Sequence, residues 1–208
     1  MDDQSPATSG GQTTAENSAL AAGSVAEPHK QSHLLREIVE TVLLTAAIFL
    51  IVNAATGRFR IEGQSMEPNL HDGEYVLIDK VSYRLHPPER GDVVVFARPN
   101  ERDFIKRVIG VPGDTVEVRG GQVWVNGRAL DEPYLSQAIR SEMAPTPVTS
   151  GTYFVMGDNR NNSSDSRAFG AISQDDIVGR AWLVYWPPSD WSVVPHHIYA
   201  AFSSPLSP

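Results

Sequence analysis

The sequence predicts a mainly β protein: an antiparallel β-sheet module with a smaller β subdomain, preceded by one N-terminal transmembrane helix. Three observations lead to this prediction. One long apolar stretch lies near the N-terminus, and after it apolar and polar residues alternate in short segments. The 15 prolines and 16 glycines among 208 residues favour strands joined by turns over a helical bundle.

The first 33 residues carry few large apolar side chains. After Met1, their only large aliphatic residues are Leu20 and Val25, and they contain no Phe, Trp or Tyr. Such a segment cannot bury enough apolar surface to offset the entropy that it would lose on ordering. We therefore expect residues 1–33 to form a disordered tail.

The apolar stretch at residues 34–57 predicts a helix that crosses a membrane. Residues 42–55 carry no charge, and extension back to Ile38 adds only Glu40, which gives nearly the ~18–20 residues that span a bilayer. The alternatives are a buried helix and a cleaved signal peptide, although a signal peptide rarely has more than roughly 30 residues before its apolar region. Basic residues flank both ends, so charge does not decide the orientation.

After this stretch, short segments with alternating or β-favouring residues predict strands. These segments are 59–62, 75–79, 92–96, 104–109, 115–118, 123–125, 153–156 and 181–185. Gly120-Gly121 indicates a hairpin, since paired glycines accept the positive φ angles of a tight turn. We expect a loop or small insertion at residues 136–150 and a short helical turn at 174–177. The alternation at Ile61 and Glu62 predicts that extended backbone continues to Gly63.

Charge and residue content exclude several classes of function. The chain has 25 acidic and 17 basic residues, so it lacks the excess of Lys and Arg that nucleic-acid binding needs. Without cysteine it has no disulfide, catalytic thiol or thiolate zinc site. His196 and His197 could be a metal-binding pair, but adjacent side chains point apart on an extended chain, so we expect an ordinary surface site there. We predict no metal and no cofactor.

Three segments place polar residues where chemistry could use them. Ser65 follows a predicted strand, Lys106 interrupts an otherwise apolar strand face, and residues 157–167 form a polar loop after an apolar strand. Each also has an ordinary structural explanation. Taken singly, they are a turn serine, a lysine whose aliphatic stem reaches a sheet edge, and a solvated loop.

Together, the three segments are typical of a serine that is activated by a lysine. A serine hydroxyl is a poor nucleophile unless a base accepts its proton, and a neutral lysine amine can be that base. Burial of Lys106 on an apolar face favours the uncharged amine and lowers its pKa. The amine also needs a group that orients it, and the polar loop offers Ser163. Arg107 should point to the opposite face of the strand.

These segments, in this order, resemble the type I signal peptidases, the membrane-bound Ser/Lys endopeptidases that remove signal peptides from exported proteins. The resemblance runs from about Glu37 to Trp186. It includes Arg90-Gly91-Asp92-Val93-Val94-Val95-Phe96, which is similar to another sequence box of that family. It implies a catalytic module that hydrolyses one peptide bond through an acyl-enzyme intermediate.

The resemblance also implies roles for single residues. Ser65 would be the nucleophile, Lys106 the general base and Ser163 the residue that orients the lysine amine. Many family members carry a serine two residues before the nucleophile as a second oxyanion donor, and here that residue is Gly63. Asn69 stands where threonine is usual, which we interpret as a tolerated change in the turn.

Two ion pairs and a set of substrate-binding positions complete the implied site. Asp158 with Arg107, and Asp165 with Arg167, would hold the polar loop against the active-site strand. The positions that would bind substrate are Ile61, Gly63, Met66, Phe104 and Ile105.

The implied partners are preproteins that carry signal peptides, and membrane lipid. A preprotein with small residues at the first and third positions before the cut would bind as an added strand. The catalytic domain would lie on the extracytoplasmic side of the plasma membrane on a single-pass anchor. Apart from the resemblance, three tryptophans near the C-terminus, Trp182, Trp186 and Trp191, predict contact with the lipid–water interface. The alternative is that Trp182 and Trp186 are core residues of a last strand.

Two other functions stay open from the sequence alone. One is a self-cleaving Ser/Lys regulator, which is usually soluble, and the other is a membrane-tethered β-rich binding module that has lost catalysis. The expected domain organisation is a tail at 1–33, a signal-anchor helix at 34–57, a catalytic domain at 58–200 and a flexible tail at 201–208.

Overall fold

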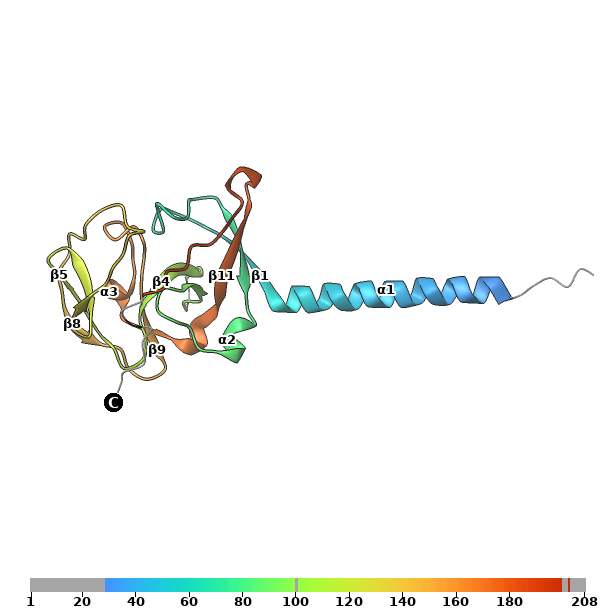
Figure 1. Cartoon of the computed structure of the whole chain (residues 1–208), viewed down its shortest axis with the longest axis horizontal. Helices are drawn as coiled ribbons and strands as arrows, with labels where there is room; N and C mark the ends of the chain where they lie inside the picture. Colours follow the sequence, from blue (N-terminus) through green and yellow to red (C-terminus); the bar gives the residue numbers. More distant parts are fainter. Residues whose placement is uncertain (1–28, 100, 200–201, 203–208) are drawn as a thin grey trace, which may run out of the picture. The chain divides into compact units, whose positions relative to one another are not determined.

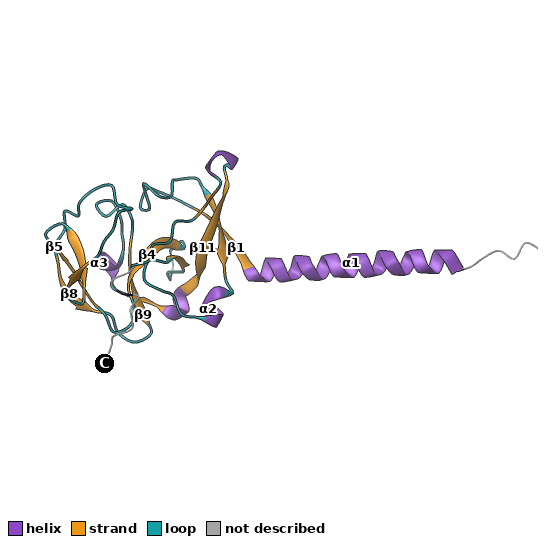
Figure 2. Cartoon of the chain, viewed as in Figure 1, coloured by secondary structure: helices purple, strands orange, loops and turns teal. Residues whose placement is uncertain are grey.

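The computed structural model describes residues 29–99, 101–199 and 202. In these residues one long helix precedes a chain that is built mainly from antiparallel strands (Figures 1 and 2), and this confirms the predicted fold class. The chain divides into two units, Met1–Ala46 and Ala47–Pro208. All strands lie in the second unit.

Helix α1 (His29–Ala55) contains the predicted apolar stretch. Its segment His33–Ala55 is long and apolar enough to cross a membrane, with a mean hydropathy of 2.2. The helix begins at residue 29 rather than 34 and ends at residue 55 rather than 57, because Thr56 already pairs with Asp79. Residues 29–33 are therefore helical rather than part of the expected tail. The rest of that tail, residues 1–28, lies outside the described residues.

The larger sheet has eight strands in the order β1-β2-β11-β3-β4-β9-β10, with β12 paired to β11. Their bounds are β1 Thr56–Arg60, β2 Tyr75–Asp79, β3 Val93–Phe96, β4 Phe104–Gly110, β9 Thr152–Met156, β10 Ile172–Ser173, β11 Ile177–Trp186 and β12 Ser192–Val193. Every strand pair is antiparallel. Each of the eight segments predicted as strands overlaps a strand of this sheet or of the second sheet.

A second sheet of four strands, in the order β7-β6-β5-β8, forms the predicted smaller β subdomain. Its bounds are β5 Thr115–Arg119, β6 Gln122–Val125, β7 Arg128–Ala129 and β8 Met143–Pro147. In Figure 1, β5 and β8 lie at the opposite end of the β unit from β1 and β11. The expectation of a loop over 136–150 is wrong for β8. That strand tolerates two prolines because it is an edge strand that pairs only with β5.

Short helices connect the strands. They are α2 Ser82–Leu85, α3 Ser166–Phe169 and the 3₁₀ turns η1 Gln174–Asp176 and η2 Pro188–Asp190. The turn predicted at 174–177 is therefore present. Phe202, within the expected C-terminal tail, packs its ring 4.4 Å from the Arg90 guanidinium.

Strand β4 is paired unequally on its two sides. Along β3 it is paired from Phe104 to Arg107, whereas β9 pairs with it only from Arg107 onward. Among the described residues, the segment from Phe104 to Lys106 therefore has no strand partner on the β9 side, although the Ile105 carbonyl accepts a hydrogen bond from the Lys106 amine. Ile105 of this segment belongs to a buried hydrophobic cluster that also contains Ile61 and Met66. The segment is therefore packed against the core.

Candidate active site

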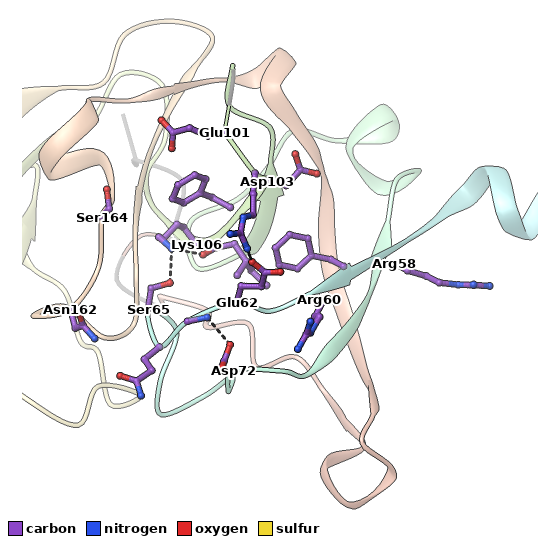
Figure 3. A pocket seen from close by; sticks show the side chains of 16 residues that line it. Arg58, Arg60, Glu62, Ser65, Asp72, Glu101, Asp103, Lys106, Asn162 and Ser164 are labelled. Atoms are coloured by element: carbon purple, nitrogen blue, oxygen red, sulfur yellow. Dashed lines mark hydrogen bonds and ion pairs between the residues drawn. The ribbon is translucent and has the colours of Figure 1, made fainter.

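Ser65 and Lys106 come together from two elements that are far apart in the sequence. Ser65 lies in the turn after β1, and this turn is closed by backbone hydrogen bonds from Ile61 to Glu74 (2.8 Å) and from Gly73 to Ile61 (2.9 Å). Lys106 lies in β4. Its Nζ donates a hydrogen bond of 2.7 Å to the Ser65 Oγ. Figure 3 marks this bond with a dashed line.

The Lys106 amine is almost completely buried, with 2% of the residue exposed. Burial lowers its pKa to about 8, although the negative charges of Asp165 and Asp158 oppose this change. The Phe104 ring, 5.4 Å from Nζ, contributes part of the apolar surroundings. A useful fraction of the amine is therefore neutral near pH 7, as a general base requires.

The second hydrogen-bond partner of the Lys106 amine is the carbonyl of Ile105, at 2.9 Å. No hydrogen bond joins Lys106 to Ser163. The Ser163 Oγ is buried without a partner of regular geometry, yet it lies close enough to Asp165 to help lower the pKa of that carboxyl. The orienting role of Ser163 stays a prediction.

A cleft of about 1270 Å³ opens beside the Ser65–Lys106 pair. Gly63, Phe104 and Ile105 line it, and their role in substrate binding stays a prediction. Ile61 and Met66 do not line it but are buried in the adjoining core, with 1% and 0% exposure. Their part in substrate binding stays a prediction, and their packing supports the turn that carries Ser65.

The polar loop contributes alternate residues to this cleft. Asn162 and Ser164 line it, whereas Ser163 lines a separate cavity of about 350 Å³ together with Arg140 and Arg167. Figure 3 shows Asn162 and Ser164 on the side of the cleft that faces Ser65. The loop hydroxyl next to the cleft is therefore that of Ser164, which the sequence did not single out.

Comparisons with known proteins show the family of this chain. A family model described as signal peptidase, peptidase S26, matches residues 34–186. The chain belongs to this signal peptidase family. It is accordingly a peptidase, as the sequence resemblance implies.

Two of the similar proteins are named as signal peptidases. The probable signal peptidase I-2 of Synechocystis sp. is 42% identical over 159 residues, which cover 73% of this chain and 72% of the relative. Signal peptidase IB of Staphylococcus aureus is 38% identical over 179 residues, which cover 75% of this chain and 93% of the relative. A crystal structure of a signal peptidase I from Enterococcus faecalis has 35% identity and a TM-score of 0.42, and covers 45% of this chain and 95% of that one.

In this chain, Arg107, which follows Lys106 in β4, forms a fully buried ion pair with Asp158. Arg107 donates through Nε and NH2 to the two carboxylate oxygens of Asp158, at 2.8 and 2.6 Å. Asn69 adds a third hydrogen bond to this carboxylate, at 2.8 Å. Asn69 therefore links the nucleophile turn to the polar loop. The sequence alone indicates only a tolerated change in the turn at Asn69 and does not predict this contact.

Asp165 and Arg167 form the second expected pair, with 2.8 Å between NH2 and Oδ2. Burial alone would raise the pKa of Asp165, but the guanidinium of Arg167 and the backbone N–H of Gly157 lower it below its ordinary value. Arg167 also donates to the Arg160 carbonyl, at 2.6 Å. These bonds fix the shape of the polar loop.

A further buried network joins the polar loop to the rest of the peptidase. Arg160 donates to both carboxylate oxygens of Glu132, at 2.8 and 2.6 Å. The Tyr134 hydroxyl contacts Glu132 and Tyr199, each at 2.6 Å. No local signal identifies these residues, since they lie in separate loops that only the tertiary fold brings together.

The expectation of an ordinary surface site at His196 and His197 is wrong, since both residues are partly buried. His196 Nδ1 lies 3.1 Å from the Val93 N–H and Nε2 lies 2.8 Å from the Ala181 carbonyl oxygen. The ring thus joins β3 to β11. Among the described residues, no group of three or more His, Cys, Asp or Glu side chains is arranged to hold a metal ion.

Proposed function

We propose that this protein is a membrane-bound type I signal peptidase that cleaves exported preproteins through a Ser65–Lys106 dyad. The observation that carries the proposal is the 2.7 Å hydrogen bond between the Lys106 amine and the Ser65 hydroxyl, at a lysine that is 2% exposed. A surface lysine in the same contact would remain charged and could not accept a proton. With a pKa of about 8, a useful fraction of the Lys106 amine is neutral near pH 7 and can act as the base.

The reaction would begin with transfer of the Ser65 hydroxyl proton to the neutral Lys106 amine. The serine oxygen then attacks the scissile carbonyl carbon, and the lysine ammonium returns its proton to the leaving amine when the C–N bond breaks. Lys106 next takes a proton from a water molecule, which attacks the ester carbonyl. When the ester C–O bond breaks, the lysine ammonium gives this proton to the Ser65 oxygen, which restores Ser65 and the neutral amine and releases the new carboxyl end.

The developing oxyanion would accept a hydrogen bond from the Ser65 backbone N–H. Among the described residues, no acceptor is paired with this N–H, so it is free to donate. One such donor typically contributes about 2.7–4 kcal/mol to the transition state where it is preorganised.

A signal peptide would bind as an added strand in the cleft. Two backbone edges without a strand partner among the described residues support this mode of binding: the outer edge of strand β1, whose other edge pairs with β2, and the Phe104–Lys106 segment of β4. Side chains of a bound strand alternate in direction, so every second one faces the floor of the cleft. The first and third positions before the cut lie on the same side of such a strand, so their small side chains would face the cleft floor together.

Membrane attachment is the other part of the proposal. Helix α1 would act as a single-pass signal anchor and the residues from 58 to 200 as an extracytoplasmic catalytic domain, with lipid contact through exposed tryptophans. Trp182, Trp186 and Trp191 are 51%, 54% and 68% exposed, whereas core tryptophans of a last strand would be buried. Such amphipathic rings favour the lipid–water interface.

Fluorescence quenching in proteoliposomes with brominated lipid tests the lipid contact. The tryptophan fluorescence of the native chain should be quenched. The fluorescence of a variant that combines Trp182→Phe, Trp186→Phe and Trp191→Phe, and so retains only Trp124, should not be quenched. Equal quenching of both proteins would contradict the lipid contact.

The function is tested by incubating a purified preprotein with a substoichiometric amount of the native chain or of Ser65→Ala. We expect many turnovers and a single cut after a small residue for the native protein, and no cut for the variant. Cleavage of its own chain alone would favour the self-cleaving regulator. Binding of the preprotein without any cleavage would favour the binding module.

A further inference from the structure

We propose that Asp72 is a positioning residue, whose carboxylate holds Gly63 in a left-handed conformation and so aims the Ser65 backbone N–H at the developing oxyanion. This inference rests on the proposed function. Asp72 Oδ1 accepts a hydrogen bond from the Gly63 N–H at 2.7 Å. Figure 3 shows this bond at the base of the segment that leads to Ser65.

The backbone at Gly63 differs from the extended conformation that the sequence predicts. Strand β1 ends at Arg60, and Gly63 has a φ of +84°. Only glycine adopts this left-handed backbone conformation at little cost. Glycine can also adopt other backbone conformations, so by itself it does not fix the orientation of the peptide groups that follow it. A fixed partner for the Gly63 N–H removes that freedom just before the nucleophile.

The position of Asp72 suits this task. It lies at the far end of the same turn, directly before Gly73, whose N–H donates to the Ile61 carbonyl at 2.9 Å. Gly63, Ser65 and Asp72 all line the same cleft. The Asp72 bond therefore closes the turn across its width, next to the backbone segment that must hold the Ser65 N–H in one direction.

A backbone clamp has a particular value at this site. The position two residues before the nucleophile has no side chain, so it offers no hydroxyl as a second oxyanion donor. Stabilisation of the oxyanion then depends strongly on the one N–H of Ser65. A donor contributes most when its direction is fixed before the reaction, since no energy is then spent on orienting it.

The contact calls for an acceptor rather than for a negative charge. Asp72 is exposed, and no ion pair with a basic residue forms at its carboxylate among the residues that the structure describes. A full negative charge beside a developing oxyanion is unfavourable. Asn supplies the same acceptor oxygen without that charge and is the matched variant.

The test compares kcat, KM and the thermal unfolding midpoint of native protein, Asp72→Ala and Asp72→Asn, with Ser65→Ala as the inactive reference. We expect Asp72→Ala to lower kcat about tenfold, less than the ~10²–10³ for complete loss of an oxyanion donor, with KM within about twofold. Asp72→Asn should match or exceed the native kcat. The exposed position predicts unchanged unfolding midpoints for both variants.

The pH dependence separates positioning from an electrostatic effect. If Asp72 positions the backbone, the midpoint of the kcat/KM profile stays near the Lys106 pKa in both variants. A native kcat in Asp72→Ala would overturn the proposal, as would an Asp72→Asn variant as slow as Asp72→Ala or a shifted midpoint. Unchanged cleavage by Ser65→Ala would instead refute the proposed function itself.

Discussion

Gly157 packs directly against the carbonyl oxygen of Ser65: a Cβ atom at position 157 would lie only 2.4 Å from that oxygen. The same Cβ would lie 2.3 Å from the Ser163 Oγ. The Ser65 carbonyl also accepts a hydrogen bond from the Asn159 N–H, at 3.0 Å. The polar loop thus passes behind the nucleophile turn at a distance that leaves no space for a side chain.

Gly157→Ala should therefore separate the nucleophile turn from the polar loop. We expect a loss of about 1–3 kcal/mol in the free energy of unfolding, which is typical of overpacking. We also expect a loss of about 10²-fold in kcat, since a shift of about 1 Å at the reacting atoms has such an effect. Chemical denaturation and a cleavage assay measure the two quantities.

Gly151→Ala is the matched control. Gly151 has a φ of +71° but no neighbouring atom within 4 Å of an added Cβ, so its substitution strains the backbone without touching the site. It should lower stability by ~1–2 kcal/mol and keep the native kcat. If Gly157→Ala behaves in the same way, the close packing does not position Ser65.

Ser163→Ala measures whether this hydroxyl orients the lysine. The Ser163 Oγ forms no hydrogen bond of regular geometry, so its loss should change the free energy of unfolding by less than about 1 kcal/mol. We expect kcat to fall and KM to stay near its native value. Native kcat together with an unchanged pH profile would show that Ser163 has only a loop role, and that the Ile105 carbonyl orients the amine.

Activity should rise with pH and level off above the Lys106 pKa. The base acts in its neutral form, so the active fraction increases as the ammonium loses its proton. With a pKa of about 8, kcat/KM should increase about tenfold per pH unit below pH 7 and become flat above pH 9. A profile that continues to rise beyond pH 10 would indicate an ordinary, solvated lysine.

The fold class could be predicted because apolar and polar residues alternate along strands that bury only one face. Strand β2 has the bounds that alternation indicates, Tyr75–Asp79, with burial of Val76 and Ile78. Strand β8 was missed because its prolines oppose strand formation everywhere except at a sheet edge. Whether a segment lies at an edge depends on the tertiary fold.

The dyad could also be predicted, since a lysine in an apolar strand is a local signal. The supporting contacts could not. Asp72 contacts Gly63 across nine positions and Asn69 contacts Asp158 across 89, and neither partner carries a local pattern. The positive φ of Gly63 was also missed, because glycine adopts extended and left-handed backbone almost equally well.

The central claim, that a neutral Lys106 activates Ser65, is tested most directly by kcat of Lys106→Arg beside Lys106→Ala on a synthetic signal-peptide substrate. Arginine keeps the positive charge and much of the packing, but its guanidinium stays protonated and cannot act as a base. We predict that both variants lose several orders of magnitude in kcat. If Lys106→Arg kept about a tenth of the native kcat, less than ~1.4 kcal/mol of the barrier would depend on the amine, and the general-base assignment would be wrong.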